Sequence, residues 1–222
     1  MSRFLQSSRA LLRIFAVASF ALCIVAPSFA QQRRPISSPI DRWVFEGGGG
    51  FTAPAGGTSN EINYGYNLMG GVGFKESRYL STIGEFEYNT AGITNSELIR
   101  QQFPDGHRSI ISVTVEQKVN LQGTPTHLYL IGGGGWYHQR TTFTEPGGPI
   151  ICDPFSGLCF GGGDIILSQF STDQAGFNAG AGFEHRLSQY SNAKLFVEAR
   201  YTYLDTPAHA TQVIPVTFGL RF

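Results

Sequence analysis

Charged residues are scarce in this sequence of 222 residues. Asp, Glu, Lys and Arg make up 14% of it, against about 25% in ordinary soluble domains. Long apolar runs are scarce as well, because no stretch after residue 30 approaches the roughly 20 apolar residues that a transmembrane helix needs. A helical membrane protein is therefore excluded, and the surface is not expected to be that of a typical soluble domain.

The first thirty residues have no acidic side chain and do not resemble part of a fold. Arg3, Arg9 and Arg13 precede an apolar run at 14–26, and small residues follow at Ser28 and Ala30. This order is typical of a secretory signal peptide that is cleaved after Ala30. We therefore predict a signal peptide at 1–30, a short extension at 31–40 and one domain at 41–222.

An excess of basic residues is absent too. The chain has 16 basic and 16 acidic residues, and the signal segment holds three of the basic ones. The remaining 13 against 16 give a net charge of −3, so nucleic acid is not an expected partner. Cysteine is rare: only Cys152 and Cys159 remain after cleavage. An even number in an exported chain predicts a disulfide between them.

Motifs for cofactors are missing. The five histidines show no metal-ligand spacing, and no Gly-Lys-Ser/Thr follows the glycine-rich tracts, which excludes a P-loop. We expect no cofactor and no metal. What the chain does contain is 28 glycines and 13% aromatic residues. In an exported chain with few charges, this composition favours a barrel that closes all its backbone hydrogen bonds within lipid.

Alternation of apolar and polar residues predicts the strands, because successive side chains of a strand face opposite ways. At the end of the chain Ile214, Val216, Phe218, Leu220 and Phe222 share one face. The same period appears in seven further segments, namely 42–51, 64–74, 80–88, 111–120, 127–142, 174–184 and 194–203. The sequence thus predicts an all-β fold, an eight-stranded antiparallel up-and-down transmembrane β-barrel.

A Gly-x-Gly-aromatic repeat fixes the facing of the segment at 127–142. Its copies end at Phe51, Phe74, Trp136 and Phe183. Since the glycines of two copies fall on the polar face, Trp136 should point outward and Tyr129 inward. Small residues on the inner face suit an eight-stranded barrel, whose interior is only just wide enough for its side chains.

Three features favour a membrane barrel over a soluble one, whose apolar face would point inward. Aromatic residues gather near one rim, as in an interfacial girdle. Short connections alternate with long ones, and the long connections are predicted at 52–63, 90–106 and 145–171. The polar face carries acids and bases that can pair in the lumen. The predicted lumenal charge network comprises Glu46, Glu85, Glu87, Glu116, Lys118, Glu184, Arg186, Glu198, Arg200 and Arg221.

On these residues the chain resembles the small outer-membrane β-barrel proteins, the group that contains the transmembrane domain of outer-membrane protein A and the opacity-type surface proteins. The last ten residues, Val-Ile-Pro-Val-Thr-Phe-Gly-Leu-Arg-Phe, carry the resemblance most specifically. It implies that Phe218, Leu220 and Phe222 form a signal for the barrel-assembly machinery. It also implies location in the outer membrane of a Gram-negative bacterium and contact with lipid and lipopolysaccharide. Unlike in the larger relatives, we expect no peptidoglycan-binding domain after the barrel.

We therefore expect a monomeric, non-enzymatic integral outer-membrane protein that is structural or interacts with an extracellular ligand through its loops. A narrow pore for small solutes is the alternative. A lipid-modifying enzyme is a third interpretation, since His107-Arg108-Ser109 resembles the His-x-Ser arrangement of outer-membrane lipid A deacylases. No carboxylate could be placed on the same face to orient the base, because Glu116 lies on the opposite one. The sequence thus argues against catalysis.

Overall fold

The structure is a computed structural model that describes residues 42–121, 126–145, 147, 150–153, 159–161, 163–188, 192–206 and 210–222. The predicted signal peptide and the extension at 31–40 lie outside the described residues. Side chains are not described at 150, 151 and 159–161.

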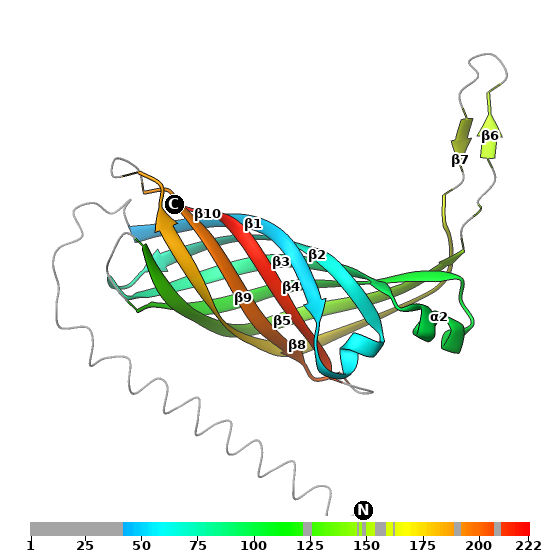
Figure 1. Cartoon of the computed structure of the whole chain (residues 1–222), viewed down its shortest axis with the longest axis horizontal. Helices are drawn as coiled ribbons and strands as arrows, with labels where there is room; N and C mark the ends of the chain where they lie inside the picture. The colour runs from blue at the N-terminus through cyan, green and yellow to red at the C-terminus, as the bar shows by residue number, and fades with distance from the viewer. Residues whose placement is uncertain are drawn as a thin grey trace, which may run out of the picture. The chain divides into compact units, whose positions relative to one another are not determined.

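Eight strands close into one antiparallel barrel, in which each strand neighbours the next one along the chain and the last pairs with the first (Figure 1). The predicted fold class is thereby confirmed. The strands are β1 (Trp43–Pro54), β2 (Ile62–Lys75), β3 (Leu80–Ile93), β4 (Asp105–Asn120), β5 (Thr126–Glu145), β8 (Ile165–Arg186), β9 (Lys194–Leu204) and β10 (Thr211–Arg221).

The barrel closes between β1 and β10. Their register runs from Glu46 opposite Arg221 to Pro54 opposite Val213. Beyond the strand, the backbone N–H of Phe222 donates to the carbonyl of Phe45 at 2.8 Å. Closure matters because a free strand edge in lipid would leave backbone groups without partners.

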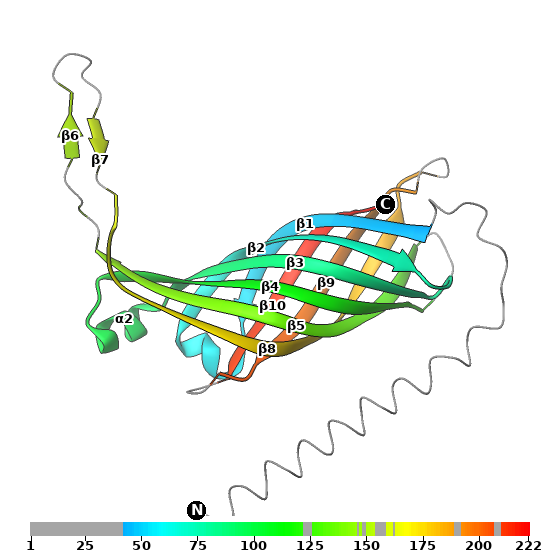
Figure 2. The same ribbon diagram turned by 180° about the vertical axis from the view of Figure 1, so that it is seen from behind.

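The two ends of the barrel differ. At the turn end, β1 begins and β10 ends. The short connections 76–79, 121–125 and 187–193 belong to the same end. At the loop end lie the 3-10 helix η3 (Gly56–Asn60), the helix α2 (Asn95–Gln101) and the two-stranded sheet of β6 (Ile150–Cys152) and β7 (Cys159–Gly161), whose strands follow β5 in the chain (Figure 2). Neither helix of the described residues is long and apolar enough to cross a membrane.

Helix α2 is short and amphipathic. Its Leu98 is buried against Ile93 and Phe143, with Phe103 packed on the same cluster. Gln102 ends the helix in the left-handed conformation, with φ of 61°. Partial burial alone would raise the pKa of Glu97, but hydrogen bonds from Gln101 and Arg100 lower it below its ordinary value. The helix thus covers the loop end of β3 and β5 with its apolar side.

The strands continue further at the loop end than predicted. The connections observed are 55–61, 94–104 and 146–164, each shorter than the predicted loop. The alternation on which the prediction rests requires lipid on one face of the strand. Beyond the membrane no lipid requires an apolar outer face, so the period fades although the hydrogen-bonded ladder goes on. Helix α2 lies in one of these segments and was not predicted.

Candidate functional site: lumen, outer wall and loop end

Nine of the ten predicted lumenal charges are buried inside the barrel, each with less than a tenth of its surface exposed. They come from β1, β3, β4, β8, β9 and β10 and occupy the inward-facing positions of these strands. Arg186 differs, because it is exposed and its guanidinium donates to Asn192 Oδ1 at 3.2 Å. Arg186 is on the predicted face of β8, but it lies at the end of the strand, where the barrel opens to water.

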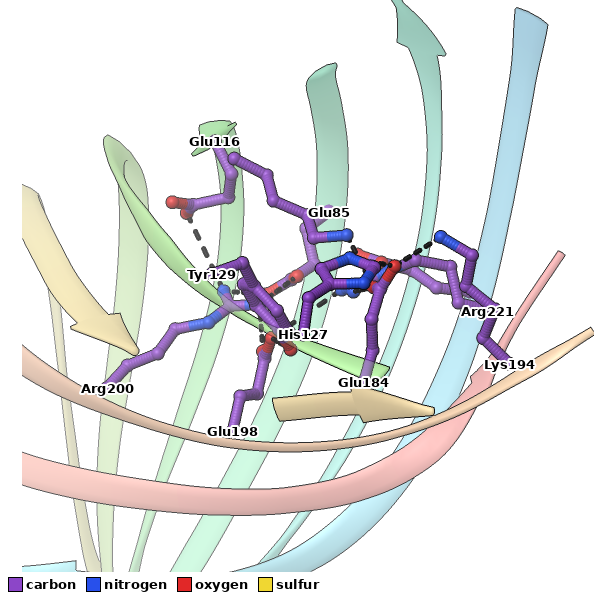
Figure 3. A network of polar contacts seen from close by, with 11 residues as sticks. Glu85, Glu116, His127, Tyr129, Glu184, Lys194, Glu198, Arg200 and Arg221 are labelled. Carbon is purple, nitrogen blue, oxygen red and sulfur yellow. Dashed lines mark hydrogen bonds and ion pairs between the residues drawn. The ribbon is translucent and has the colours of Figure 1, made fainter. Parts of the chain in front are cut away.

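Glu184 is the centre of the half of the network nearer the turn end (Figure 3). Its carboxylate accepts from Lys118 Nζ at 2.5 Å and from Arg221 Nη1 at 2.8 Å. His127 Nε2 lies 2.9 Å from it, and Lys194 forms a further ion pair. A carboxylate with no exposed surface is thus surrounded by cations and held by charge-assisted hydrogen bonds.

Aromatic rings support these cations from the other side. The Arg221 guanidinium lies 4.5 Å from the ring centre of Phe196 and 5.0 Å from that of Tyr129. Lys118 Nζ lies 4.5 Å from the Tyr129 centre. The Tyr129 hydroxyl donates to Glu198 at 2.7 Å. Cation–π contacts and ion pairs therefore fill the same cross-section of the lumen.

Arg200 organises the half of the network nearer the loop end. Its two terminal nitrogens each donate to one Glu85 oxygen at 2.6 Å, a bidentate pair, and the guanidinium also pairs with Glu198. Glu116 is more distant, with Oε1 at 3.9 Å from Arg200 Nη1. Its closest donor is Asn178 Nδ2, at 2.6 Å. Figure 3 shows the Glu116 carboxylate set apart from the other acids.

Sequence reasoning omitted several members of this network. His127, Tyr129 and Asn178 were not named as site residues, although each lies in or beside the ion pairs. The alternation of β5 could have indicated two of them, because His127 and Tyr129 share its inner face. Their chemistry, by contrast, depends on contacts across the barrel, which alternation along one strand does not predict.

An apolar layer lies in the lumen on the loop side of the charges. It consists of buried residues from six strands that form one cluster, namely Ile62, Ala91, Ile110, Tyr137, Leu204 and Val213. Ile62 and Leu204 are 2% and 0% exposed, so this layer excludes solvent where they lie. Charged and apolar side chains together line the described interior.

A hollow of about 420 Å³ lies on the outer wall near the loop end, lined in part by His107, Ser109, His138 and Arg140. His138 Nδ1 is 2.8 Å from Asp173 Oδ1, on the next strand. Ser109 lies opposite Arg140, two residues along β4 from Ile111, which faces His138. No carboxylate was predicted on this face. That was wrong, because Asp173 provides one.

Strand β8 rises beyond its neighbour β9. Pairing between them begins at Gly176 opposite Leu204, whereas β8 pairs with β5 up to Ile165 opposite Glu145. Residues 165–175 therefore have a partner strand on one side only, within the part of the chain that the structure describes. Their backbone forms an open edge of roughly 35 Å at the usual rise per residue.

Two further predicted groups have clear positions. Phe218, Leu220 and Phe222 point outward and are exposed by 48%, 41% and 52%, as lipid-facing residues of the last strand. Cys152 lies directly opposite Cys159 in the ladder of β6 and β7, but the disulfide stays a prediction. The described residues hold no cluster of three or more His, Cys, Asp or Glu suited to a metal ion.

A comparison with known protein families gives a match over most of the chain. The model of the family described as outer membrane protein beta-barrel domain matches residues 15–222. No curated protein matches the sequence.

Solved structures similar to the chain are small barrels of low sequence identity. The attachment invasion locus protein Ail of Yersinia pestis is 18% identical, with 81% of this chain and 97% of that chain covered and a TM-score of 0.47. Neisserial surface protein A is 13% identical, with 81% and 94% covered and a TM-score of 0.49. OprG of Pseudomonas aeruginosa is 10% identical, with 81% and 95% covered and a TM-score of 0.45.

Proposed function

The chain belongs to the outer membrane protein β-barrel domain family, and from this premise we propose that it is a closed barrel that presents its loop end to extracellular polypeptides. It is an integral outer-membrane protein of a Gram-negative bacterium, as the resemblance implied. In our proposal the chain is exported by residues 1–30, assembles through its last strand, and places the turn end in the periplasm. Lipopolysaccharide then surrounds the outer rim.

The open edge of β8 is the observation that carries this proposal. An unpaired strand edge binds an extended polypeptide by adding it to the sheet, with main-chain hydrogen bonds providing affinity. Native proteins usually protect such an edge with Lys, Pro or a short strand. Residues 165–175 contain neither Lys nor Pro. The edge is therefore well suited to pair with a partner strand.

A side-chain contact accompanies the edge. Phe170 is 61% exposed and meets Phe143 edge to face, with ring centres 6.5 Å apart. Phe143 in turn stacks on Phe103 at 4.3 Å. A partner strand paired with β8 would set its own apolar side chains beside Phe170, which provides the specificity that backbone pairing lacks.

The buried ion pairs and the apolar layer support a scaffold over the alternative of a narrow pore. We infer that the buried charges stabilise the barrel interior and take no part in acid–base catalysis, since most are held in ion pairs with one another. Planar-bilayer recording tests this: the purified protein should give no single-channel steps. Discrete openings at ordinary voltages would favour the pore.

Photo-crosslinking on intact cells tests the surface role. A photoreactive residue in place of Phe170 should give crosslinked adducts that protease removes, because the partner is a polypeptide. The same residue in place of Phe183, on the outer face nearer the turn end, is the control and should crosslink only lipid. Adducts equal at both positions, or none at Phe170, would refute the proposal.

A second candidate function, hydrolysis of a lipid ester, has one observation in its favour. The pair of Asp173 and His138 resembles the orienting half of a serine-hydrolase triad, and Ser109 lines the same hollow. Ser109 Oγ would add to the ester carbonyl while His138 takes its proton and returns it to the leaving alcohol. Water would then release the acid.

A fluorophosphonate probe distinguishes the two candidates. If the hollow is catalytic, the folded protein is labelled, labelling is lost in Ser109→Ala, and it is strongly reduced in Asp173→Asn. Ser171→Ala on the neighbouring strand is the matched control and should remain labelled. An unlabelled wild-type protein leaves the non-enzymatic proposal alone.

A further inference from the structure

The buried charges of the lumen do not balance. Six carboxylates, those of Glu46, Glu85, Glu87, Glu116, Glu184 and Glu198, are buried in the described barrel. Four cationic side chains pair with them, namely Lys118, Lys194, Arg200 and Arg221. His127 adds one more charge only when protonated. An uncompensated charge in a barrel interior costs several kcal/mol, so the deficit requires a counter-ion or a proton.

The deficit is concentrated in the half nearer the loop end. Near the turn end, Glu46 pairs with Arg221 at 2.5 Å and Glu184 has four basic neighbours. Around Arg200, by contrast, Glu85 and Glu198 occupy both terminal nitrogens. Glu116 is left with a distant contact at 3.9 Å. Glu87 has no ion pair within 4.0 Å among the described residues.

Two buried oxygens at one place have no hydrogen-bond partner. They are Glu116 Oε2 and Asn178 Oδ1, in residues that are 0% and 5% exposed. Both residues face Gly133, which pairs with Glu116 on one side and with Asn178 on the other. The Tyr137 hydroxyl lies 3.3 Å from Asn178 Nδ2. Asn178 Nδ2 also donates to Glu116 Oε1 at 2.6 Å, so the carboxylate, the amide group and the hydroxyl are in contact, while Glu116 Oε2 and Asn178 Oδ1 keep no partner.

Gly133 makes room for this group. A Cβ atom at this position would come within 2.6 Å of Glu116 Oε2, so any side chain would displace the carboxylate. The inner face of β5 therefore carries no side chain at this position, and the Glu116 carboxylate lies against its backbone. Carboxylate, amide and hydroxyl oxygens are hard donors, which are the ligands that alkali and alkaline-earth cations prefer.

We propose that Glu116 and Asn178, with the Tyr137 hydroxyl beside them, bind one Na⁺ ion inside the barrel. The ion supplies a positive charge that Arg200 cannot provide to Glu116, and it satisfies the two unpartnered oxygens. A monovalent ion fits a site with one carboxylate and two neutral donors. The apolar layer at the loop end and the ion pairs at the turn end enclose it, so exchange with solvent is slow. The site does not depend on any function of the loop end.

Refolding of the full chain in detergent tests the site. Wild-type protein refolded with Na⁺ should unfold at a temperature about 5 °C higher than protein refolded with N-methylglucammonium at the same ionic strength. Glu116→Gln should abolish the difference. Glu87→Gln, a buried acid of the same lumen outside the proposed ligand set, is the matched control and should retain it.

Two outcomes overturn the proposal. Equal unfolding temperatures of the wild-type protein in both cations would mean that a proton or water fills the space. A difference that persists in Glu116→Gln would place the Na⁺ effect elsewhere. If Glu116→Gln does not fold, retention of radioactive Na⁺ by the wild-type protein through desalting decides: one ion per chain supports the site, and none refutes it.

Discussion

Gly133 shows how a single residue determines what the lumen contains. Its absent side chain leaves space for Glu116 Oε2, and a Cβ would also collide with the carbonyl oxygen of Val115. The second collision is with backbone and cannot be relieved by a rotamer change. Glycine at this position is therefore a packing requirement of the sheet as well as of the polar group.

We expect Gly133→Ala to destabilise the barrel by about 1–3 kcal/mol, as overpacking does. Gly70→Ala is the matched control, because its Cβ would find its nearest atom at 3.9 Å and should change stability little. Urea unfolding in detergent, followed by the heat-modifiable gel shift, measures both. Similar losses in the two variants would contradict the packing argument.

Val115 can test which residues of β4 face the lipid. It lies near the middle of the membrane-spanning part of β4, points outward and is 58% exposed. Val115→Arg should therefore cost about 2–4 kcal/mol, the penalty for a cation at the bilayer midplane. His107→Arg, on the same face at the loop end, should cost far less. The comparison requires folding into lipid vesicles, and equal penalties would mean that the membrane boundary is misplaced.

At the scale of elements, β10 is the strand that completes the barrel. Phe222 contributes two backbone hydrogen bonds with Phe45, at 2.8 and 3.3 Å, and an outward aromatic side chain. Its deletion should lower the stability of the folded barrel only modestly. The larger effect should be on assembly in cells, because the terminal aromatic is what the barrel-assembly machinery is expected to read.

We therefore expect the Phe222 deletion to be degraded or to remain in the periplasm, yet to fold in detergent. Fractionation of cells and refolding in vitro provide the two measurements. Phe218→Leu, which keeps the apolar face, serves as the control and should reach the outer membrane. Normal levels of the deletion in the outer membrane would contradict the terminal signal.

The hairpin of β6 and β7 should be independent of the barrel. The backbone register places Cys152 opposite Cys159, and a bridge closing so small a ring would contribute roughly 2–3 kcal/mol to local stability. Replacing both with Ser should leave barrel unfolding unchanged while making the hairpin more sensitive to protease. Free-thiol titration of the exported wild-type protein checks the bridge, and two free thiols would disprove it.

Strands β5 and β8 mark the limit of what the sequence could predict. Within the membrane, alternation correctly assigned the inward and outward residues, for example Tyr129 and Trp136, which are 0% and 46% exposed. Beyond it the same strands continue through Ser168 and Thr142, where apolar and polar residues no longer alternate between the two faces. The open edge of β8 depends on β9 stopping earlier, which is a relation between strands.

At the scale of the whole molecule, the candidate site is a property of the closed barrel. Alternation placed the charges inside, but the pairs of Arg200 with Glu85 and Arg221 with Glu184 join residues 115 and 37 positions apart. Such pairs arise only when the sheet curves and closes. The same closure brings Asp173 beside His138, which explains why strand-by-strand analysis missed the carboxylate of the outer wall.

A substitution of Glu184 tests whether the lumenal charges stabilise the barrel as one cooperative unit. Its carboxylate compensates Lys118, Arg221 and Lys194 together, so Glu184→Gln leaves several buried cations facing one another without their shared anion. Removing one member of a buried ion-pair network typically costs about 3–5 kcal/mol. Because cations on three strands lose their partner at once, the loss should appear in the global unfolding of the barrel, measured by urea titration in detergent, and not only as local fraying. Glu76→Gln, at an exposed turn, should stay within about 0.5 kcal/mol of the wild-type protein. If Glu184→Gln were as stable as Glu76→Gln, the lumenal charges would be incidental to the fold, and stability would have to come from the strand ladder and the apolar layer alone.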